Sequence, residues 1–415
     1  MTTEVVIGNR QAIALAADSA VTVGQDRVWK TANKLFSLGP ANDIGIMMNG
    51  SADFLGISWE VIIKLFREDV SEKRFVTVKE CADAFFAFVS KDRFRSERTE
   101  KLSFAGLFVE NLEALKDHLD YKTKKDFRSQ IVAVCDHNVK AISEETRKIA
   151  SLSLSSFRKD WREIIDSLAK DVLGEVITKN VSDSITKLLH ALAVHNVESE
   201  FATGIVIAGF GSEEMYPCMQ SYTVDGCAGS VFRVWEDRVQ DLNGSGSRGG
   251  YIVPFGQADI VFSFMEGITL ESNEFLDTII PQLLEDRIKD VIDHYVPSQN
   301  RVVEAAIQKK INDEAYSLFK QNFSDFRTRT ISNPVVKVIN SLPKEDLADM
   351  AQALVELTSL RRKVDSKLET VGGPVDVAVI SKGDGFIWLK RKNYFDIDSN
   401  RDFLYRRYRN QGLRT

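Results

Sequence analysis

Strand-like segments occur at both ends and in the middle of the chain, and two long helical blocks separate them. The strand-like segments are short apolar runs bounded by turn residues. The helical blocks carry apolar residues at the spacing of an amphipathic helix. This alternation predicts one α+β core with two helical insertions rather than a chain of separate domains. The apolar runs are residues 3–8, 12–17, 43–49, 202–209, 215–224, 230–236, 251–255, 375–380 and 385–389.

The same pattern sets the expected boundaries. Core segments should span 2–110, 201–268 and 336–395, with helical insertions at 111–200 and 269–335 and a tail at 396–415. Two apolar runs joined by the polar turn Gly8–Gln11 predict a hairpin at the N-terminus. A second hairpin is expected around Ser381–Asp384. Helices are expected over 54–67, 78–89 and 344–363.

Composition favours a soluble globular protein and argues against several functional classes. Hydrophobic residues make up 44% of the 415 residues and charged residues 27%, so wholesale disorder is not expected. A formal net charge of −6 gives no electrostatic reason to bind nucleic acid or an anionic membrane. No apolar run reaches the ~18 residues of a membrane span, and the N-terminus lacks the basic region of a signal peptide. We expect a cytoplasmic protein.

The cysteines do not indicate a disulfide framework or a metal site. There are four in the whole chain, so reduced thiols are expected. Cys135 and His137 form the only Cys/His pair at a spacing typical of ligands. A zinc site needs about four ligands with paired spacing. We therefore predict no metal.

The chemically informative segment is Met1-Thr2-Thr3. Aminopeptidases that remove the initiator Met accept a small second residue such as Thr. Loss of Met1 would place an α-amine and a hydroxyl on Thr2, which is a nucleophile with its own base. The amine has an unperturbed pKa of about 7.7–8.0, so an appreciable neutral fraction exists at neutral pH.

Two charged residues follow at regular spacing. Asp18 ends the second apolar run, and Lys34 lies sixteen residues beyond it. A buried ammonium beside Thr2 would favour the alkoxide and keep the α-amine neutral. Asp18 would hold Lys34 charged and oriented. By themselves, an ordinary surface Asp and Lys are the alternative interpretation.

These residues and several others resemble proteasome β-subunits and the bacterial two-ring proteasome-like peptidase. Mature chains of that family begin Thr-Thr and place an Asp and a Lys at two successive intervals of sixteen residues, as Thr2, Asp18 and Lys34 do. The resemblance covers roughly half of the chain and leaves the two helical blocks without a counterpart. The similar stretches are Ala16–Ser19, Thr22, Gly24, Asn33–Phe36, Met48–Asp53, Ile207–Phe210, Tyr222–Gly226, Gly372–Ile380 and Lys382–Gly385.

The resemblance implies a fold, a mechanism and a substrate. The fold would be the four-layer αββα sandwich of N-terminal-nucleophile hydrolases. Thr2 would be the nucleophile, Asp18 and Lys34 its supports, and the backbone N–H near Met47 the oxyanion donor. A peptide or unfolded protein would lie as an extended strand, without any cofactor. The resemblance also implies a homo-oligomer such as a ring, and an ATPase unfoldase as partner. The substrate-binding residues would be Val21, Thr22, Gly24, Ala32 and Phe36.

Two departures from the family pattern leave alternatives open. Gln257 stands where the family often has a Ser beside the nucleophile, and the usual Asp-x-x-Ser before the last hairpin is missing. The two-ring peptidase also lacks this second pair, so its loss does not by itself imply inactivity, and Gln257, Asp259 and Glu369 are the candidates to compensate. One alternative is an N-terminal-nucleophile amidase acting on a small molecule. The other is a catalytically inactive scaffold that keeps the fold.

Overall fold

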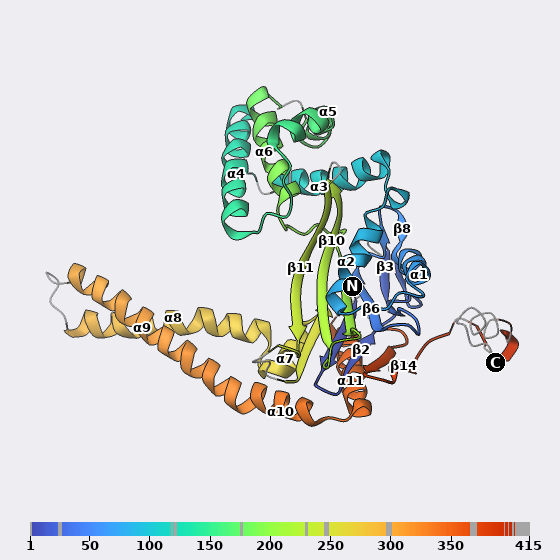
Figure 1. The fold of residues 1–415 in the computed structure, drawn as a ribbon. Coiled ribbons are helices and arrows are strands. Elements are labelled where there is room, and N and C mark those ends of the chain that lie inside the picture. Colours follow the sequence, from blue (N-terminus) through green and yellow to red (C-terminus); the bar gives the residue numbers. More distant parts are fainter. Residues whose placement is uncertain are drawn as a thin grey trace. The chain divides into compact units, whose positions relative to one another are not determined.

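Residues 2–23, 27–117, 119, 123–174, 177–228, 231–244, 249–295, 301–365, 372–393, 395, 396, 398–400 and 402 are described by the computed structural model. The protein has a mixed α/β fold with antiparallel sheets and helices (Figure 1). Its contacts divide the chain into two units. The first unit comprises Met1–Thr31, Gly246–Val379 and Trp388–Tyr394, and the second comprises Ala32–Ser245, Ile380–Ile387 and Phe395–Thr415.

A five-stranded sheet lies mainly in the first unit. Its strands are β1 (Thr3–Gly8), β2 (Ala12–Ala17), β12 (Tyr251–Gly256), β13 (Asp376–Ser381) and β14 (Gly385–Lys390). The order is β12-β1-β2-β13-β14, so the N-terminal hairpin lies in the interior of the sheet. Every residue of β1, β2 and β13 is buried, which means that both faces of the sheet are covered.

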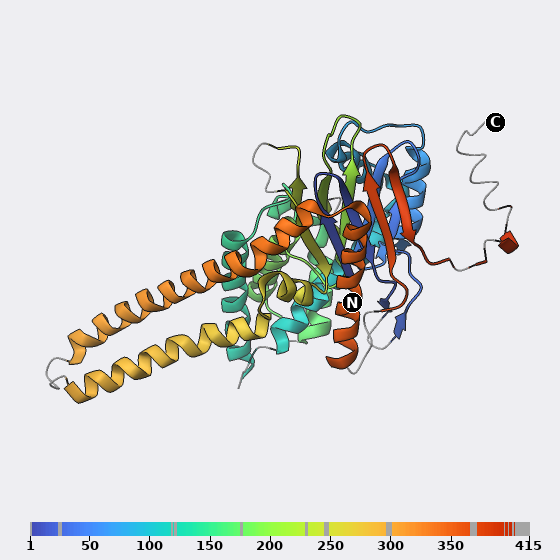
Figure 2. The same cartoon turned by 90° about the horizontal axis from the view of Figure 1, so that it is seen from below.

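The helices of the first unit lie between β12 and β13 in the sequence. They are α7 (Asp259–Glu266), α8 (Leu270–Tyr295), α9 (Arg301–Arg327), the π-helical turn η3 (Thr328–Ser332), α10 (Asn333–Ser341) and α11 (Lys344–Asp365). Helix α11 packs on β1 and β2 through Leu347, Ala351 and Val355, all fully buried. Helices α8 and α9 run side by side as a long hairpin (Figures 1 and 2).

The second unit contains another five-stranded sheet. Its strands are β5 (Leu35–Ser37), β6 (Asp43–Gly50), β9 (Thr203–Phe210), β10 (Cys218–Ala228) and β11 (Val231–Asp241), in the order β11-β10-β9-β6-β5. Helices α1 (Trp59–Asp69) and α2 (Val78–Val89) lie in its main apolar core. Trp59, Phe66 and Phe85 from these helices pack ring against ring and are buried. Thr77 caps α2 by accepting a hydrogen bond from the Glu80 N–H at 3.1 Å.

Four further helices of the second unit have an apolar core of their own. They are α3 (Glu97–Asp117), α4 (Lys124–Glu145), α5 (Leu154–Leu173) and α6 (Lys179–Val194). Phe104, Phe108, Phe157 and Trp161 form its aromatic centre. The side chains of Thr123, Ser153 and Thr178 cap the N-termini of α4, α5 and α6. This block therefore has both the core and the end signals of an ordinary helical domain.

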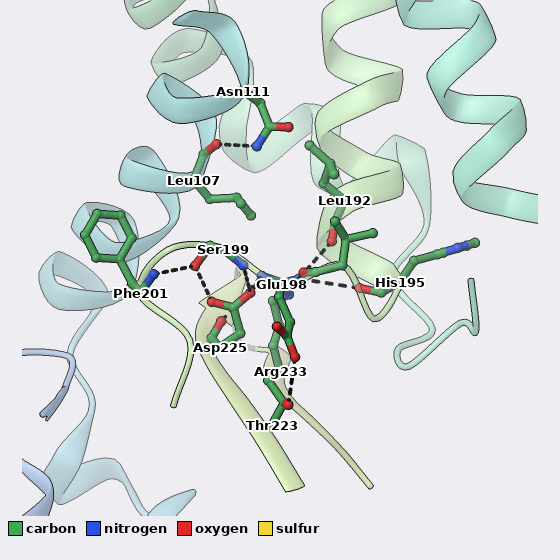
Figure 3. Close-up of polar contacts among 11 residues, drawn as sticks. Leu107, Asn111, Leu192, His195, Glu198, Ser199, Phe201, Thr223, Asp225 and Arg233 are labelled. Carbon is green, nitrogen blue, oxygen red and sulfur yellow. Dashed lines mark hydrogen bonds and ion pairs between the residues drawn. The ribbon is translucent and has the colours of Figure 1, made fainter. Parts of the chain in front are cut away.

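A buried arginine joins this helical block to the sheet (Figure 3). The Arg233 side chain on β11 is 1% exposed and forms an ion pair with Asp225 of β10 at 2.7 Å. Its guanidinium also donates to the carbonyls of Val197 at 2.7 Å, Leu192 at 3.2 Å and His195 at 3.4 Å. Leu192 lies in the last turn of α6, whose carbonyls have no partner within the helix. One side chain thus ties the end of α6 to two strands.

Short elements complete the described chain. They are the ladders β3 (Val21–Val23) with β4 (Arg27–Trp29) and β7 (Asp53–Phe54) with β8 (Ile57–Ser58), and the 3₁₀ turns η1 (Asp92–Phe94) and η4 (Asp398–Asn400). None of the described helices is long and apolar enough to cross a membrane. All four cysteines are unbridged and buried. Within the described residues, no cluster of three or more His, Cys, Asp or Glu side chains could hold a metal ion.

Candidate functional site

Thr2, the predicted nucleophile, directly precedes β1 and is only 5% exposed. Its carbonyl oxygen accepts a hydrogen bond from the Gln257 N–H at 2.8 Å. Gly256 of β12 pairs with Thr3 and has a φ of +69°. A Cβ at Gly256 would lie 2.2 Å from the Thr2 carbonyl oxygen and 2.8 Å from Thr2 Oγ1. The backbone of β12 therefore approaches Thr2 so closely that only glycine fits.

Asp18, the predicted orienting carboxylate, directly follows β2 and is fully buried. Its Oδ1 accepts a hydrogen bond from the Thr3 N–H at 3.3 Å, and its Oδ2 accepts one from the Gly372 N–H at 3.0 Å. The Asp18 N–H in turn donates to the Thr3 carbonyl at 3.1 Å. Backbone donors thus satisfy both oxygens of this buried carboxyl group, and one of these donors belongs to the residue next to Thr2.

Lys34 and Met47 belong to the second unit. Lys34 is 1% exposed, and its carbonyl oxygen accepts a hydrogen bond from the Met48 N–H at 3.0 Å. Met47 lies on β6 opposite Leu35 of β5 and is fully buried. Removing an ammonium from water is costly, so buried lysines are paired or hydrogen-bonded. The burial of Lys34 contradicts the alternative of an ordinary surface lysine.

The predicted substrate-binding residues have different surroundings. Val21 and Ala32 are half-buried, and Thr22 on β3 pairs with Val28 of β4. Phe36 is 6% exposed and belongs to the apolar core of the second unit, next to β6. Gly24 lies outside the described residues.

The predicted supporting residues also differ. Gln257 is 7% exposed and contacts Thr2 through its backbone N–H. Asp259 Oδ2 forms an ion pair with Arg362 of α11 at 2.7 Å, so this carboxylate is bound to a helix of the same unit. Glu369 lies outside the described residues.

Two residues of this region were not predicted as site residues. Gly256 gives the close approach to Thr2, and Gly372 provides a donor to Asp18. Both adopt positive φ, at +69° and +138°, a region that favours glycine. The sequence signals were Phe255-Gly-Gln and the Gly-Gly pair before the last hairpin. Neither signal predicts which residue the glycine contacts, because Thr2 and Asp18 lie far away in the sequence.

Comparisons with known proteins give no family match for this chain. No protein-family model matches it, and no curated protein does. Among solved structures, similar ones include the helical assembly of the Anbu complex from Pseudomonas aeruginosa, at 10% identity and a TM-score of 0.28, covering 100% of this chain and 96% of that one. Anbu (ancestral β-subunit) from Yersinia bercovieri has 9% identity, a TM-score of 0.28 and coverages of 99% and 94%. Anbu from Hyphomicrobium sp. strain MC1 has 9% identity, a TM-score of 0.30 and coverages of 99% and 98%.

These findings correct the family expected from the sequence. The chain was predicted to resemble proteasome β-subunits and the two-ring peptidase, but the three solved structures named above are Anbu proteins, a different proteasome-like subfamily. The predicted family is therefore wrong. The motifs on which the resemblance rests are short and cover about half of the chain. They therefore indicate which side chains occur together, but they do not distinguish one proteasome-like subfamily from another. At such low identities and TM-scores, these structures carry no further argument.

Proposed function

We propose that this chain is an N-terminal threonine hydrolase that cleaves peptide bonds through Thr2 after removal of Met1. The observation that carries the proposal is the buried carboxylate of Asp18, held by the N–H groups of Thr3 and Gly372 one residue from Thr2. Burying a carboxyl group is costly unless hydrogen bonds or an opposite charge compensate it, and here the backbone donors fix Asp18 next to the proposed nucleophile. Lys34, buried in the second unit, supplies a matching charge for the same chemistry.

The proposed reaction is acyl transfer. Thr2 Oγ attacks the peptide carbonyl carbon, and its proton passes to the Thr2 α-amine. The tetrahedral intermediate collapses as the α-ammonium returns this proton to the leaving amine, which gives an ester on Thr2. Water, deprotonated by the same amine, then hydrolyses the ester and releases the acid. Lys34 favours the alkoxide, Asp18 orients Lys34, and the N–H near Met47 donates to the oxyanion.

The contacts around Thr2 support the proposal that the nucleophile is held in one position. The Gln257 N–H holds the Thr2 carbonyl, and Gly256 closes the space beside Oγ1. A nucleophile held in one position loses little entropy on reaching the transition state. In this proposal Gln257 contributes its backbone, so the missing family Ser does not remove this restraint. Asp259 contributes indirectly, by fixing the start of α7 to α11.

Substrate and assembly are part of the same proposal. An extended peptide would pair with backbone near Thr22 and Gly24, with Val21, Ala32 and Phe36 at the side-chain pocket. The chain would act as a homo-oligomer, with an ATPase unfoldase as partner. The stacking of the two sheets into an αββα sandwich and the division into three core segments with two insertions stay predictions from the sequence. A crystal structure of the assembly would test these points.

The test compares three forms of the untagged protein: wild type, Thr2→Ala and Thr2→Ser. All three keep a small second residue, so Met1 is removed in each. Intact mass and peptide mapping after exposure to a β-lactone report acylation of residue 2, and hydrolysis of fluorogenic peptides reports activity. We expect one adduct at Thr2 in the wild type, partial function in Thr2→Ser, and a loss of at least about 10³-fold in Thr2→Ala.

The outcomes separate the competing functions. Peptide hydrolysis by Thr2→Ala at the wild-type rate would overturn the proposal. Acylation of Thr2 with hydrolysis of small amides but not of peptides would favour the amidase. An N-terminal Thr2 that never reacts would favour the inactive scaffold.

A further inference from the structure

A cavity of about 500 Å³ opens in the second unit, and every residue that lines it belongs to that unit. Its walls come from the start of α3, the β7–β8 hairpin, the segment that leads into β9 and the last part of β10. The described lining includes none of the residues proposed for the reaction at Thr2. Sites for small molecules have volumes of roughly 300–1,000 Å³. This cavity is therefore large enough to hold a small organic molecule.

One wall of the cavity is the tight turn of the β7–β8 hairpin. Leu55 and Gly56 are its two central residues, with φ of +52° and +83°. Such a turn needs positive φ at both positions, which favours Asn, Asp or Gly at the first. In the described part of the chain, Leu55 is the one residue other than glycine with positive φ. The turn thus places an apolar side chain in the cavity wall, in a backbone conformation that is strained for leucine.

A second wall combines helix α3 with an aromatic ring. A Cβ at Gly106 of α3 would lie 3.2 Å from Phe201 Cε2, so the phenyl ring lies directly on the helix backbone. The Phe201 N–H donates to Ser199 Oγ at 3.2 Å, and that hydroxyl donates to Asp225 Oδ1 at 2.5 Å (Figure 3). Phe201 is still 51% exposed, and Leu102 of the same lining is 63% exposed. An apolar ligand in the cavity would remove surface of both side chains from water.

The polar groups of the lining fall into two kinds. The hydroxyls of Ser51, Thr99 and Thr203 are hydrogen-bonded to carbonyl oxygens of the protein. In contrast, no hydrogen bond or ion pair from the described part of the chain reaches the Asp53 carboxylate or the Ser103 hydroxyl. Asp53 is also the one charged residue of the described lining. The cavity therefore offers a carboxylate that can only accept hydrogen bonds, and no cation that could attract an anion.

We propose that this cavity binds an organic ammonium ion that carries an aromatic or branched aliphatic group. The apolar group would lie on Leu55, Leu102 and Phe201, and the ammonium would pair with the Asp53 carboxylate. A neutral apolar ligand fits less well, because it would displace water from this carboxylate without replacing the lost hydrogen bonds. An anion would meet an uncompensated like charge. The proposal goes beyond the reaction at Thr2, and its test needs no hydrolysis.

The first test compares three ligands that share a phenyl ring and differ in charge. Isothermal titration of the full chain measures the binding of 2-phenylethylamine, 2-phenylethanol and 3-phenylpropionate. For molecules of about nine heavy atoms we expect dissociation constants in the millimolar range. The amine should bind about two- to fivefold more tightly than the alcohol, which is the contribution of a solvent-exposed ion pair, and the acid should bind weakest. Absence of saturable binding of the amine, or binding of the acid as tight as that of the amine, would overturn the proposal.

Two substitutions separate the charge from the apolar wall. Asp53→Asn keeps the shape of the side chain and should remove the preference for the amine over the alcohol. Asp117→Asn makes the same change at an exposed position of α3 outside the lining, and it should keep the preference. Leu102→Ala should weaken the binding of the amine and of the alcohol alike. Circular dichroism verifies folding, and unchanged amine binding in both Asp53→Asn and Leu102→Ala would show that the amine binds elsewhere and would overturn the proposal.

The same ammonium chemistry occurs in a free amine and in the first residue of a polypeptide. Phenylalanine N-methylamide mimics such a first residue, and its N-acetyl form lacks the charge. Both are titrated into the Thr2→Ala protein, so that hydrolysis does not interfere. Tighter binding of the N-methylamide than of 2-phenylethylamine would identify a polypeptide N-terminus as the ligand, and weaker binding would identify a small amine. Binding of the N-acetyl form as tight as that of the free form would contradict recognition of the ammonium and overturn the proposal.

Discussion

Gly256 makes the sharpest prediction about a single residue. In Gly256→Ala, the new Cβ would meet the Thr2 carbonyl oxygen and Oγ1 at distances that atoms do not adopt, so β12 or Thr2 must move. We expect β-lactone labelling of Thr2 to fall at least about tenfold, because a displacement near 1 Å is enough to misplace a nucleophile. Labelling is measured by intact mass at matched times.

Gly56 provides the matched control for this substitution. It has a similar positive φ of +83°, but a Cβ there would meet nothing within 4 Å. Gly56→Ala therefore carries the same backbone strain without the crowding. Equal labelling rates in the two alanine variants would show that crowding at Gly256 does not affect Thr2.

Glu110 makes a prediction about pH dependence. Burial, with repulsion from Glu200 and Asp225, raises the pKa of the Glu110 carboxyl above its usual value. A raised pKa means that the folded state binds the proton more tightly, so stability is fully present below the unfolded pKa of about 4.3 and declines as pH rises through the folded pKa. We expect Glu110→Gln to stabilise the protein at neutral pH and to have no effect in acid.

Urea unfolding at both pH values measures this difference. Glu113→Gln, at an exposed position of the same helix α3, is the control. A stabilisation by Glu110→Gln that is as large in acid as at neutral pH would contradict the explanation by charge.

The sequence predicts side chains of the candidate site but not the backbone around them. The spacing of Thr2, Asp18 and Lys34 predicts these three as site residues, and the structure shows that all three are buried. The Gly372 donor to Asp18 and the close approach of Gly256 to Thr2 come from segments more than two hundred residues away. No local pattern can identify such partners, because they are set by strand register and not by periodicity.

At the scale of elements, the buried ion pair of Arg233 with Asp225 can be tested by its effect on stability. Arg233→Met leaves the Asp225 carboxylate buried without its cation and removes the donor to three carbonyls at the end of α6. Losing one partner of a buried ion pair costs about 3–5 kcal/mol. We expect a loss of this size in the free energy of unfolding, measured in urea. Adding Asp225→Asn should recover part of it, and a double variant no more stable than Arg233→Met would contradict this account.

Element types were predictable where a periodic pattern runs through the whole element. Strands β1 and β2 and helix α2 begin and end at the predicted residues. The first predicted helix is different: it begins only at Trp59, because Phe54 belongs to the small ladder β7–β8. Strand β11 runs to Asp241, beyond the predicted end at 236. It lies at the edge of its sheet, so polar residues there pair through the backbone without an apolar pattern.

At the scale of the whole molecule, the chain returns to each sheet from distant segments. Sheet order in the first unit joins residues 3–17 to 251–256 and to 376–390. The alternation of strand-like and helical segments in the sequence was enough to predict a core that combines sheets and helices, because strands need partners that cover both of their faces. The order of the strands could not be derived, because apolar runs of similar composition could pair in several ways.

The last prediction concerns the α8–α9 hairpin as a removable part of the first unit. Its two ends are held together at the base: Arg327 pairs with Glu266 at 3.1 Å, and the Ser332 hydroxyl donates to the Met265 carbonyl at 3.0 Å. A short Gly/Ser turn in place of residues 270–325 should therefore join α7 to η3 without strain, and closing so short a loop costs little entropy.

We expect the deletion variant to unfold in one cooperative transition and to keep β-lactone labelling of Thr2 at the wild-type rate. Labelling is the decisive readout, because it reports the site rather than the hairpin. If deletion abolishes labelling in a folded protein, the hairpin contributes to the site, and the separation of chemistry from the hairpin fails. If labelling persists, the chemistry at Thr2 is independent of the hairpin.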